Sequence, residues 1–179
     1  MAGWSTCWWR TRSIASASAL DGAVLNFARR RGHDPFLERA LAIYSRTGEH
    51  AACWLGLGLA GAALTSDADR RRQWLHGVRV VAGSYAFNYA VKIAVRRPRP
   101  QLPGLPPLTH TVSGLSFPSA HATTSFAACR AYRGLVPAAV LYAAAGLFAL
   151  SRPYLGVHYP SDVAAGAILG TVIGEGWPR

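Results

Sequence analysis

The stretch SRPYLGVHYPSD, residues 151–162, places an arginine, a histidine and an aspartate next to two prolines. Apolar runs flank it on both sides, and each is long enough for a helix. Because proline cannot donate to the helical hydrogen-bond ladder, Pro153 is expected to stop the helix before it, and Pro160 to start the helix after it. The stretch is therefore predicted to hold its three charged or polar side chains where two helices meet.

Apolar segments elsewhere in the chain extend this pattern to a bundle. Helices are predicted over residues 51–65, 74–95, 119–130, 135–150 and 160–173. Several of them would span only about 20–25 Å, which is short for a hydrocarbon core of about 30 Å. Their many Gly and Ala residues favour close helix packing in lipid. We therefore expect an all-α fold, a small transmembrane helical bundle, with a soluble Ala-rich helical protein as the alternative.

The N-terminal part is predicted to lie in the membrane interface. Its first residues, MAGWSTCWWRTR, mix tryptophan with arginine, as is typical of membrane interfaces. Leu20, Val24 and Phe27 recur at helical spacing with polar residues elsewhere, which indicates an amphipathic helix, and an Asp-Pro pair opens a second short helix. We divide the chain into an interfacial amphipathic segment, residues 1–48, and a transmembrane core, residues 49–179.

Composition narrows the class of partner. Hydrophobic residues make up 51% of the chain and charged residues only 15%, and the net charge is +11. The arginines form short clusters between apolar runs, which suits membrane flanks better than a nucleic-acid groove. Membrane lipids are therefore the expected partners, and nucleic acid is not; the chain is expected in the cell membrane as a multi-pass protein. The oligomeric state is not indicated.

The side of the membrane that carries the site stays open. The arginines at 70–72 and at 130 and 133 lie opposite the predicted site and would face the cytoplasm. The segment 1–48 carries seven arginines, however, and they favour the reverse orientation if this segment does not cross the membrane.

Further polar residues fall at the predicted helix ends. Lys92 lies near the end of one helix, and Arg99 follows it in the run RRPRP. Ser119 and His121 open the helix after Pro118, where free N–H groups favour an anion. If the helices run up and down, these ends share one face with the stretch 151–162. The predicted cluster consists of Lys92, Arg99, Ser119, His121, Arg152, His158 and Asp162.

This set of side chains suits a phosphate group. Three cations can hold a dianionic phosphate, and the arginines can do so with paired N–H bonds. A histidine beside an aspartate can attack phosphorus, and a second histidine can transfer a proton. Because Asp162 is the only carboxylate beside the histidines, no metal site and no cofactor is expected. The cations must then stabilise the developing charge, so the sequence predicts metal-independent phosphoester hydrolysis.

Three motifs resemble the signatures of the type-2 phosphatidic acid phosphatase superfamily in order and spacing. They are Lys92-x6-Arg99-Pro100, Pro118-Ser119-Ala120-His121 and Ser151-Arg152-x5-His158-x3-Asp162. The resemblance implies that His158 is the nucleophile and forms a phosphohistidine, that Asp162 orients it, and that His121 protonates the leaving oxygen. It implies phosphate contacts from Lys92, Arg99, Ser119, Arg152 and the backbone N–H of Ala120. The family usually has glycine where Ala120 stands, and alanine still supplies that N–H group.

Shorter segments bear on the substrate. YSRTGEH, SFPSAHAT and LGVHYPSD are similar to segments of actinobacterial decaprenylphosphoryl-5-phosphoribose phosphatases of cell-wall arabinan synthesis. This resemblance implies a polyprenyl-linked phosphate monoester as substrate, with decaprenylphosphoryl ribose as product. Hydrolysis of undecaprenyl pyrophosphate or phosphatidylglycerophosphate is an alternative. A vanadium-dependent haloperoxidase-like protein and a non-enzymatic lipid-binding protein are alternatives of other classes.

Other polar residues are less specific. Glu49 and His50 precede the first apolar helix on the side of the predicted site. They could line the substrate entrance, or they could simply supply the polarity common at helix N-termini. Arg96 and Arg97 are predicted to contact anionic lipids, and His33, His76 and His110 are expected to have no role in the site.

Overall fold

The protein is described by a computed structural model that covers residues 8–178, with side chains from residue 19 onward. The opening segment MAGWSTCWWRTR, expected at the membrane interface, therefore lies outside the described side chains. The helices are α1 (Trp8–Arg30), α2 (Pro35–Thr47), η1 (Glu49–Ala51), α3 (Ala52–Leu64), α4 (Ala68–Val95), α5 (Ala120–Ala131), α6 (Ala138–Tyr154) and α7 (Pro160–Gly176). The described residues form no β-strand, which confirms the prediction of an all-α fold.

Helices α5 and α7 pack with their backbones in contact. Helix α7 carries a glycine at every fourth position of residues 166–174, and a Cβ added at Gly170 would lie 2.1 Å from the backbone oxygen of Thr123. Such a close approach is open only to residues without a side chain. The pairing also joins the first turns of the two helices, because the backbone N–H of Ser119 donates to the carbonyl of Asp162 at 3.0 Å.

A buried aromatic cluster joins α3 and α4 to α5. The side chain of Tyr132 is fully buried, and its hydroxyl donates to the carbonyl of Trp54 at 2.9 Å. The ring fits where two glycines leave room, since a Cβ at Gly77 would lie 2.1 Å from it and a Cβ at Gly58 would lie 2.2 Å from its hydroxyl. These contacts fix the middle of the bundle and leave the polar helix ends free to form a site.

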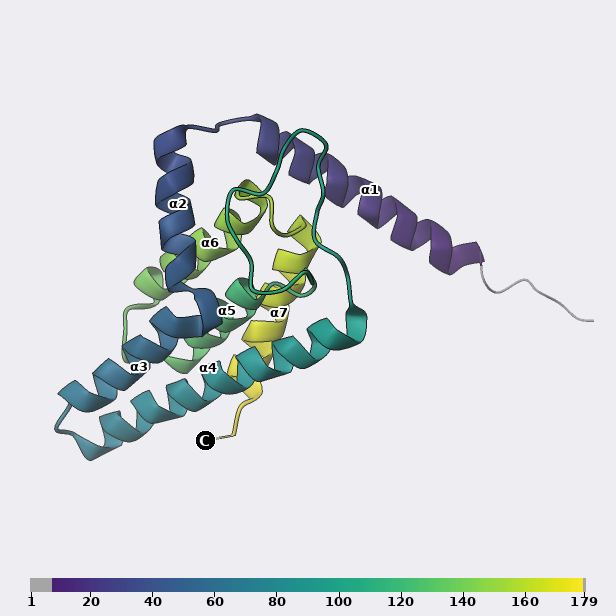
Figure 1. Cartoon of the computed structure of the whole chain (residues 1–179). Helices are drawn as coiled ribbons and strands as arrows, with labels where there is room; N and C mark the ends of the chain where they lie inside the picture. Colours follow the sequence, from purple (N-terminus) through teal and green to yellow (C-terminus); the bar gives the residue numbers. More distant parts are fainter. Residues whose placement is uncertain (1–7, 179) are drawn as a thin grey trace, which may run out of the picture.

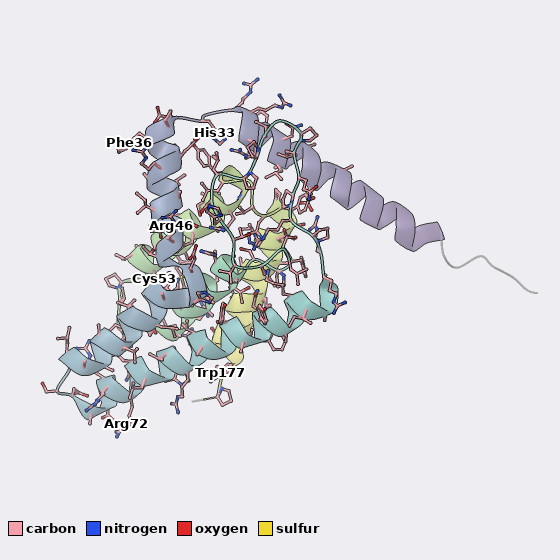
Figure 2. The ribbon with its side chains drawn as sticks, in the orientation of Figure 1. His33, Phe36, Arg46, Cys53, Arg72 and Trp177 are labelled. Atoms are coloured by element: carbon pink, nitrogen blue, oxygen red, sulfur yellow. The ribbon has the colours of Figure 1, made fainter. Side chains whose placement is uncertain are left out.

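Figure 1 shows how the elements are arranged around this centre. Helix α4 runs along one edge, and the long segment 96–119 crosses the ends of α6 and α7 before α5 begins. Helix α1 extends away from the body. In Figure 2, Arg72 marks the beginning of α4, at the opposite end of this helix from the segment 96–119.

Two helix boundaries differ from the sequence-based expectation. Helix α4 begins at Ala68 and not at residue 74, because the carboxylate of Asp67 caps it by accepting the backbone N–H groups of the second and third helical residues, both at 2.8 Å. Helix α6 runs through Pro153 to Tyr154. The proline stands in the last turn, where it removes only one hydrogen bond, so the helix ends one residue after it and not before it.

Helix α1 is amphipathic in the predicted register, but its polar side faces the protein. Leu20, Val24 and Phe27 are 67%, 45% and 64% exposed, whereas Asp21 and Arg29 are only 7% and 5% exposed. Arg29 donates to the carbonyl of Pro106 at 2.7 Å. The amphipathic pattern therefore has its polar side on the body of the protein, where ion pairs and carbonyl groups receive Asp21 and Arg29.

Helix α2 begins as predicted. Asp34 is its N-cap and accepts the backbone N–H groups of Phe36 at 2.9 Å and Leu37 at 3.1 Å. Figure 2 shows Phe36 at the outer side of this helix, and it is 81% exposed. None of the helices in residues 8–178 is both long enough and apolar enough to cross a membrane.

Candidate active site

The helix ends meet in one pocket, as the sequence predicts. The pocket encloses about 60 Å³, roughly two water volumes. Five residues of the predicted cluster line it, together with Ala120: Lys92, Arg99, His121, Arg152 and His158. Ser119 and Asp162 lie directly behind them and are fully buried.

His158 follows α6 and is held between an arginine and a carboxylate. Its Nε2 lies 3.1 Å from a terminal nitrogen of Arg99, and its Nδ1 lies 3.6 Å from Oδ2 of Asp162. Because a guanidinium group only donates, Nε2 is the acceptor, and the ring proton sits on Nδ1, facing the carboxylate. Burial lowers the pKa of His158 well below its usual value, and the neighbouring cations lower it further. A neutral imidazole with a free Nε2 is the form that can act as a nucleophile.

Asp162 is fixed by the first turn of its own helix and by an arginine. Its Oδ2 accepts the backbone N–H of Tyr159 at 2.9 Å, and its Oδ1 accepts a hydrogen bond from Arg97 at 2.8 Å. The same guanidinium pairs with Asp21 of α1, also at 2.8 Å. Arg97 was expected to contact anionic lipid, and this was wrong for its guanidinium, which joins two buried carboxylates behind the pocket.

Three cations surround the pocket. The Nζ of Lys92 donates to three backbone carbonyls of residues 115–118 at 3.0 to 3.3 Å. Arg99 donates to the carbonyls of Ser113 and Val157, both at 2.7 Å, and burial lowers its pKa to about 10, so it stays charged at neutral pH. Arg152 is 2% exposed. Buried cations that share one pocket repel one another, so the arrangement favours an anion between them.

His121 stands in the first turn of α5 and is held by α2. Its Nε2 lies 2.9 Å from the backbone carbonyl of Ser45, and because a carbonyl only accepts, this nitrogen carries a proton. The hydroxyl of Ser45 also accepts a hydrogen bond from Arg152. Gly48 packs against the ring, since a Cβ added there would lie 2.8 Å from Cδ2 of His121.

The pocket also receives residues that the motifs do not contain. Glu49 and His50, which were predicted either to line the substrate entrance or to supply polarity at a helix N-terminus, line the pocket. Tyr85 and Tyr89 of α4 line it beside them. Ser45, Gly48 and Tyr85 were not predicted as site residues, because no pattern in the sequence distinguishes them. His33, expected to lie apart from the site, stacks on Tyr154 with ring centres 4.3 Å apart and pairs with Glu38 at 2.9 Å. His110 was also expected to lie apart from the site, and this was wrong, because the segment 96–119 brings it to the pocket wall.

The charged side chains that line the pocket are mainly cations, which do not coordinate metal ions. Within residues 8–178 no three His, Cys, Asp or Glu side chains gather as a metal site would require. The site described by these distances is an anion pocket with one unprotonated imidazole nitrogen, one protonated imidazole nitrogen and three cations.

Residues 74–178 of the chain match the sequence model of the PAP2 superfamily. The chain belongs to the PAP2 superfamily. The family resemblance stated from the three motifs is thereby confirmed, and with it the expectation of a phosphatase.

Curated relatives support the assignment over most of the chain. One is a decaprenylphosphoryl-5-phosphoribose phosphatase of Mycobacterium tuberculosis, 42% identical over 130 residues, which are 73% of this chain and 72% of that protein. Another, of the same name, comes from Mycolicibacterium smegmatis and is 44% identical over 127 residues, 68% of this chain and 67% of that protein.

Solved structures of other members share the fold. A transmembrane PAP2 type phosphatidylglycerolphosphate phosphatase from Bacillus subtilis superposes with a TM-score of 0.72 at 23% identity, covering 89% of this chain and 83% of that one. LpxE from Aquifex aeolicus superposes with a TM-score of 0.65 at 20% identity, covering 86% of this chain and 91% of that one. At such identities these similarities show the PAP2-type fold alone.

Proposed function

We propose that this protein is a membrane-embedded phosphatase that hydrolyses decaprenylphosphoryl-5-phosphoribose, a polyprenyl-linked phosphate monoester, to decaprenylphosphoryl ribose. The observation that carries the proposal is the unprotonated Nε2 of His158 in a pocket lined by three cations. The substrate follows from the names of two relatives that are 42% and 44% identical to the chain.

The first half-reaction transfers the phosphoryl group to His158. Lys92, Arg99 and Arg152 hold the phosphate oxygens, together with the Ser119 hydroxyl and the backbone N–H of Ala120 at the start of α5. Nε2 of His158 attacks phosphorus, and the bond from phosphorus to the ester oxygen breaks. The imidazole becomes positively charged, and Asp162 stabilises that charge. His121 acts as an imidazolium once the dianionic phosphate is bound: its Nε2–H stays on the carbonyl of Ser45, and its Nδ1 donates a proton to the leaving oxygen, which departs as a neutral alcohol.

The second half-reaction releases inorganic phosphate. His121, now short of one proton, accepts a proton from a water molecule that attacks the phosphohistidine. The bond from phosphorus to Nε2 breaks, and His158 returns to its neutral form. Every step uses side chains of this chain and water.

The membrane placement follows from the outer surface of the helices. Large apolar side chains point outward from α6 and α7: Val140, Leu147, Leu150, Ile168 and Val172 are between 44% and 72% exposed. An exposed apolar surface of this kind is stable in lipid. We propose a multi-pass protein of the cell membrane, in which residues 49–179 form the embedded core and residues 1–48 lie at the interface, where Leu20, Val24 and Phe27 of α1 face the lipid.

Phosphate release from a panel of lipids tests the proposal. The purified full-length chain is given decaprenylphosphoryl-5-phosphoribose, undecaprenyl pyrophosphate and phosphatidylglycerophosphate in separate reactions. We expect the highest kcat/KM on the first, and we expect His158→Ala to lower kcat by at least about 10⁴-fold, because the nucleophile is lost. His33→Gln, outside the pocket, is the control and retains activity.

Two outcomes would overturn this assignment. Higher kcat/KM on either of the other two lipids would move the function to that substrate. Halide peroxidation in the presence of vanadate, without phosphate release from any lipid, would place the chain in a different enzyme class.

A further inference from the structure

The segment that connects α2 to α3 forms one wall of the pocket. Residues 48–51 line it together with the phosphate-binding groups, and Glu49 and His50 stand in η1 within this wall. Tyr85 and Tyr89, one helical turn apart on α4, complete the wall. This part of the pocket lies beyond the three motifs, and the mechanism described above does not use it.

The backbone of this wall is held in an unusual conformation. His50 and Ala51 have φ of 52° and 59°, in the left-handed region that residues with a Cβ rarely adopt. Core packing keeps them there, because Ala51 is 1% exposed and its N–H donates to the carbonyl of Gly48 at 3.1 Å. Strained backbone that persists in this way is concentrated at functional sites. The consequence here is that two successive polar side chains, Glu49 and His50, are presented at the pocket.

The carboxylate of Glu49 is free to bind a ligand. It is half-buried, and among the described residues its side chain takes part in no hydrogen bond or close ion pair. Its charge does act on the nearby guanidinium of Arg152. A negative group opposes the binding of a phosphate, so the phosphoryl group itself gains nothing from Glu49. Carboxylate oxygens do accept hydrogen bonds from hydroxyl groups, and each carboxylate can accept two from a pair of neighbouring hydroxyls.

Beside Glu49 stands a preformed polar pair. Nδ1 of His50 lies 2.9 Å from the hydroxyl of Tyr85, and the two rings meet edge to face with centres 5.9 Å apart. Glu49, His50 and Tyr85 line the same pocket. The wall therefore offers hydrogen-bonding groups and aromatic surface, the combination that suits a hydroxylated ring.

We propose that Glu49, with the His50–Tyr85 pair, forms a subsite for the vicinal hydroxyl groups of the alcohol that leaves phosphorus. The subsite rests on the proposed function, because it adjoins the position of the leaving group only if His158 is the nucleophile. It selects a polyhydroxylated leaving group such as a pentose. It also acts against a pyrophosphate, whose second phosphate would face the carboxylate of Glu49.

The test compares two substrates that differ only in these hydroxyls: decaprenylphosphoryl-5-phosphoribose and its analogue without the ribose 2- and 3-hydroxyls. We expect the wild-type chain to prefer the hydroxylated substrate. We expect Glu49→Ala to lower kcat/KM on that substrate about tenfold to a hundredfold, as the loss of hydrogen bonds to a charged group does, and not to lower kcat/KM on the analogue, which has no hydroxyls for Glu49 to bind. On the hydroxylated substrate, the kcat/KM of Glu49→Gln should lie between those of the wild type and Glu49→Ala. Glu49→Gln should also raise kcat/KM on undecaprenyl pyrophosphate.

The controls separate this subsite from the function on which it rests. Tyr85→Phe should lower kcat/KM on the hydroxylated substrate only, and Glu38→Gln, an acid of α2 that pairs with His33, should change neither substrate. Equal wild-type rates on the two substrates, or equal losses on both in Glu49→Ala, overturn the subsite while the phosphatase stands. No phosphate release from either substrate by the wild type overturns the proposed function, and the subsite with it.

Discussion

Helices α4–α7 and the elements that precede them, α1, α2 and η1, contribute to the pocket in different ways. The later helices and their connecting segments supply every group that we place on the phosphate or the leaving oxygen, and these groups stand at helix ends or, like Arg99, in a connecting segment. The earlier elements supply contacts to those groups. Asp21 of α1 pairs with Arg97, and Ser45 of α2 contacts both His121 and Arg152.

The difference teaches that reactivity and placement come from separate parts of the chain. The match to the family extends over residues 74–178, which contain the reactive groups, while Asp21, Ser45 and Gly48 lie before it. Removing a reactive group should abolish a chemical step, whereas removing a supporting contact should misplace a group that is still present. Mutations in the two regions can therefore be ranked and compared.

Among the residues that support the reactive groups, Arg97 is expected to show the largest effect. Its guanidinium joins the two regions, because it pairs with Asp21 of α1 and Asp162 of α7. Arg97→Ala leaves the carboxylates of Asp162 and Asp21 buried without their shared cation, which is strongly unfavourable. Asp162 would then take up a proton or turn away from His158. We expect kcat for phosphate release to fall about 10³-fold. Asp21→Asn, which keeps the Arg97–Asp162 pair, should lower kcat only about tenfold.

Arg96→Ala is the matched control for this prediction. Arg96 is exposed, and its guanidinium donates to the carbonyl of Ile93 at 3.2 Å. A similar loss in Arg96→Ala and Arg97→Ala would show that the effect is one of surface charge. The double variant Asp21→Asn with Arg97→Ala should lose less than the two single losses combined, because both belong to one ion-pair network.

This pair of arginines also shows where sequence reasoning ends. Arg96 and Arg97 are adjacent and chemically identical, and the run RRPRP gives no reason to separate them. The structure separates them because Arg96 adopts a left-handed conformation, with φ of 54°, at the end of α4. The chain turns there, so one side chain stays at the surface and the next enters the site. Its partner Asp21 lies 76 residues away in the sequence, and no local pattern connects the two.

The helix ends, by contrast, could be predicted from the sequence. Proline positions and apolar runs are local signals, and they placed Lys92, His121 and His158 at helix ends on a common face. The side of α1 that faces the body could not be predicted in this way. Hydrophobic periodicity gave its register, but buried ion pairs decided which face packs, and these depend on tertiary contacts.

An intermediate effect is expected at Gly48, between α2 and η1. A Cβ at this position would lie 2.6 Å from Cε1 of Phe148 and 2.8 Å from Cδ2 of His121, so at least one ring must move. Displacement of the group that protonates the leaving oxygen should lower kcat about 10²-fold in Gly48→Ala. Gly56→Ala in α3 is the control, since a Cβ there meets open space. Equal activity of the two variants would show that the connection to α3 does not position His121.

The smallest effect is expected at Ser45, and it can separate the two contacts that this residue makes. Ser45→Ala removes the hydroxyl that accepts from Arg152 but keeps the backbone carbonyl that accepts from His121. Arg152 would lose a guide for phosphate binding, so KM should rise about tenfold, as the loss of a hydrogen bond to a charged group predicts. The backbone contact that holds His121, the proton donor, is retained in Ser45→Ala, so kcat should change little. Thr47→Ala, two residues on, removes an exposed hydroxyl that donates to the carbonyl of Tyr44 at 2.7 Å and should change neither constant. A fall in kcat as large as the rise in KM would mean that Ser45 positions Arg152 and His121 together. The hydroxyl of Ser45 would then not serve phosphate binding separately from proton transfer.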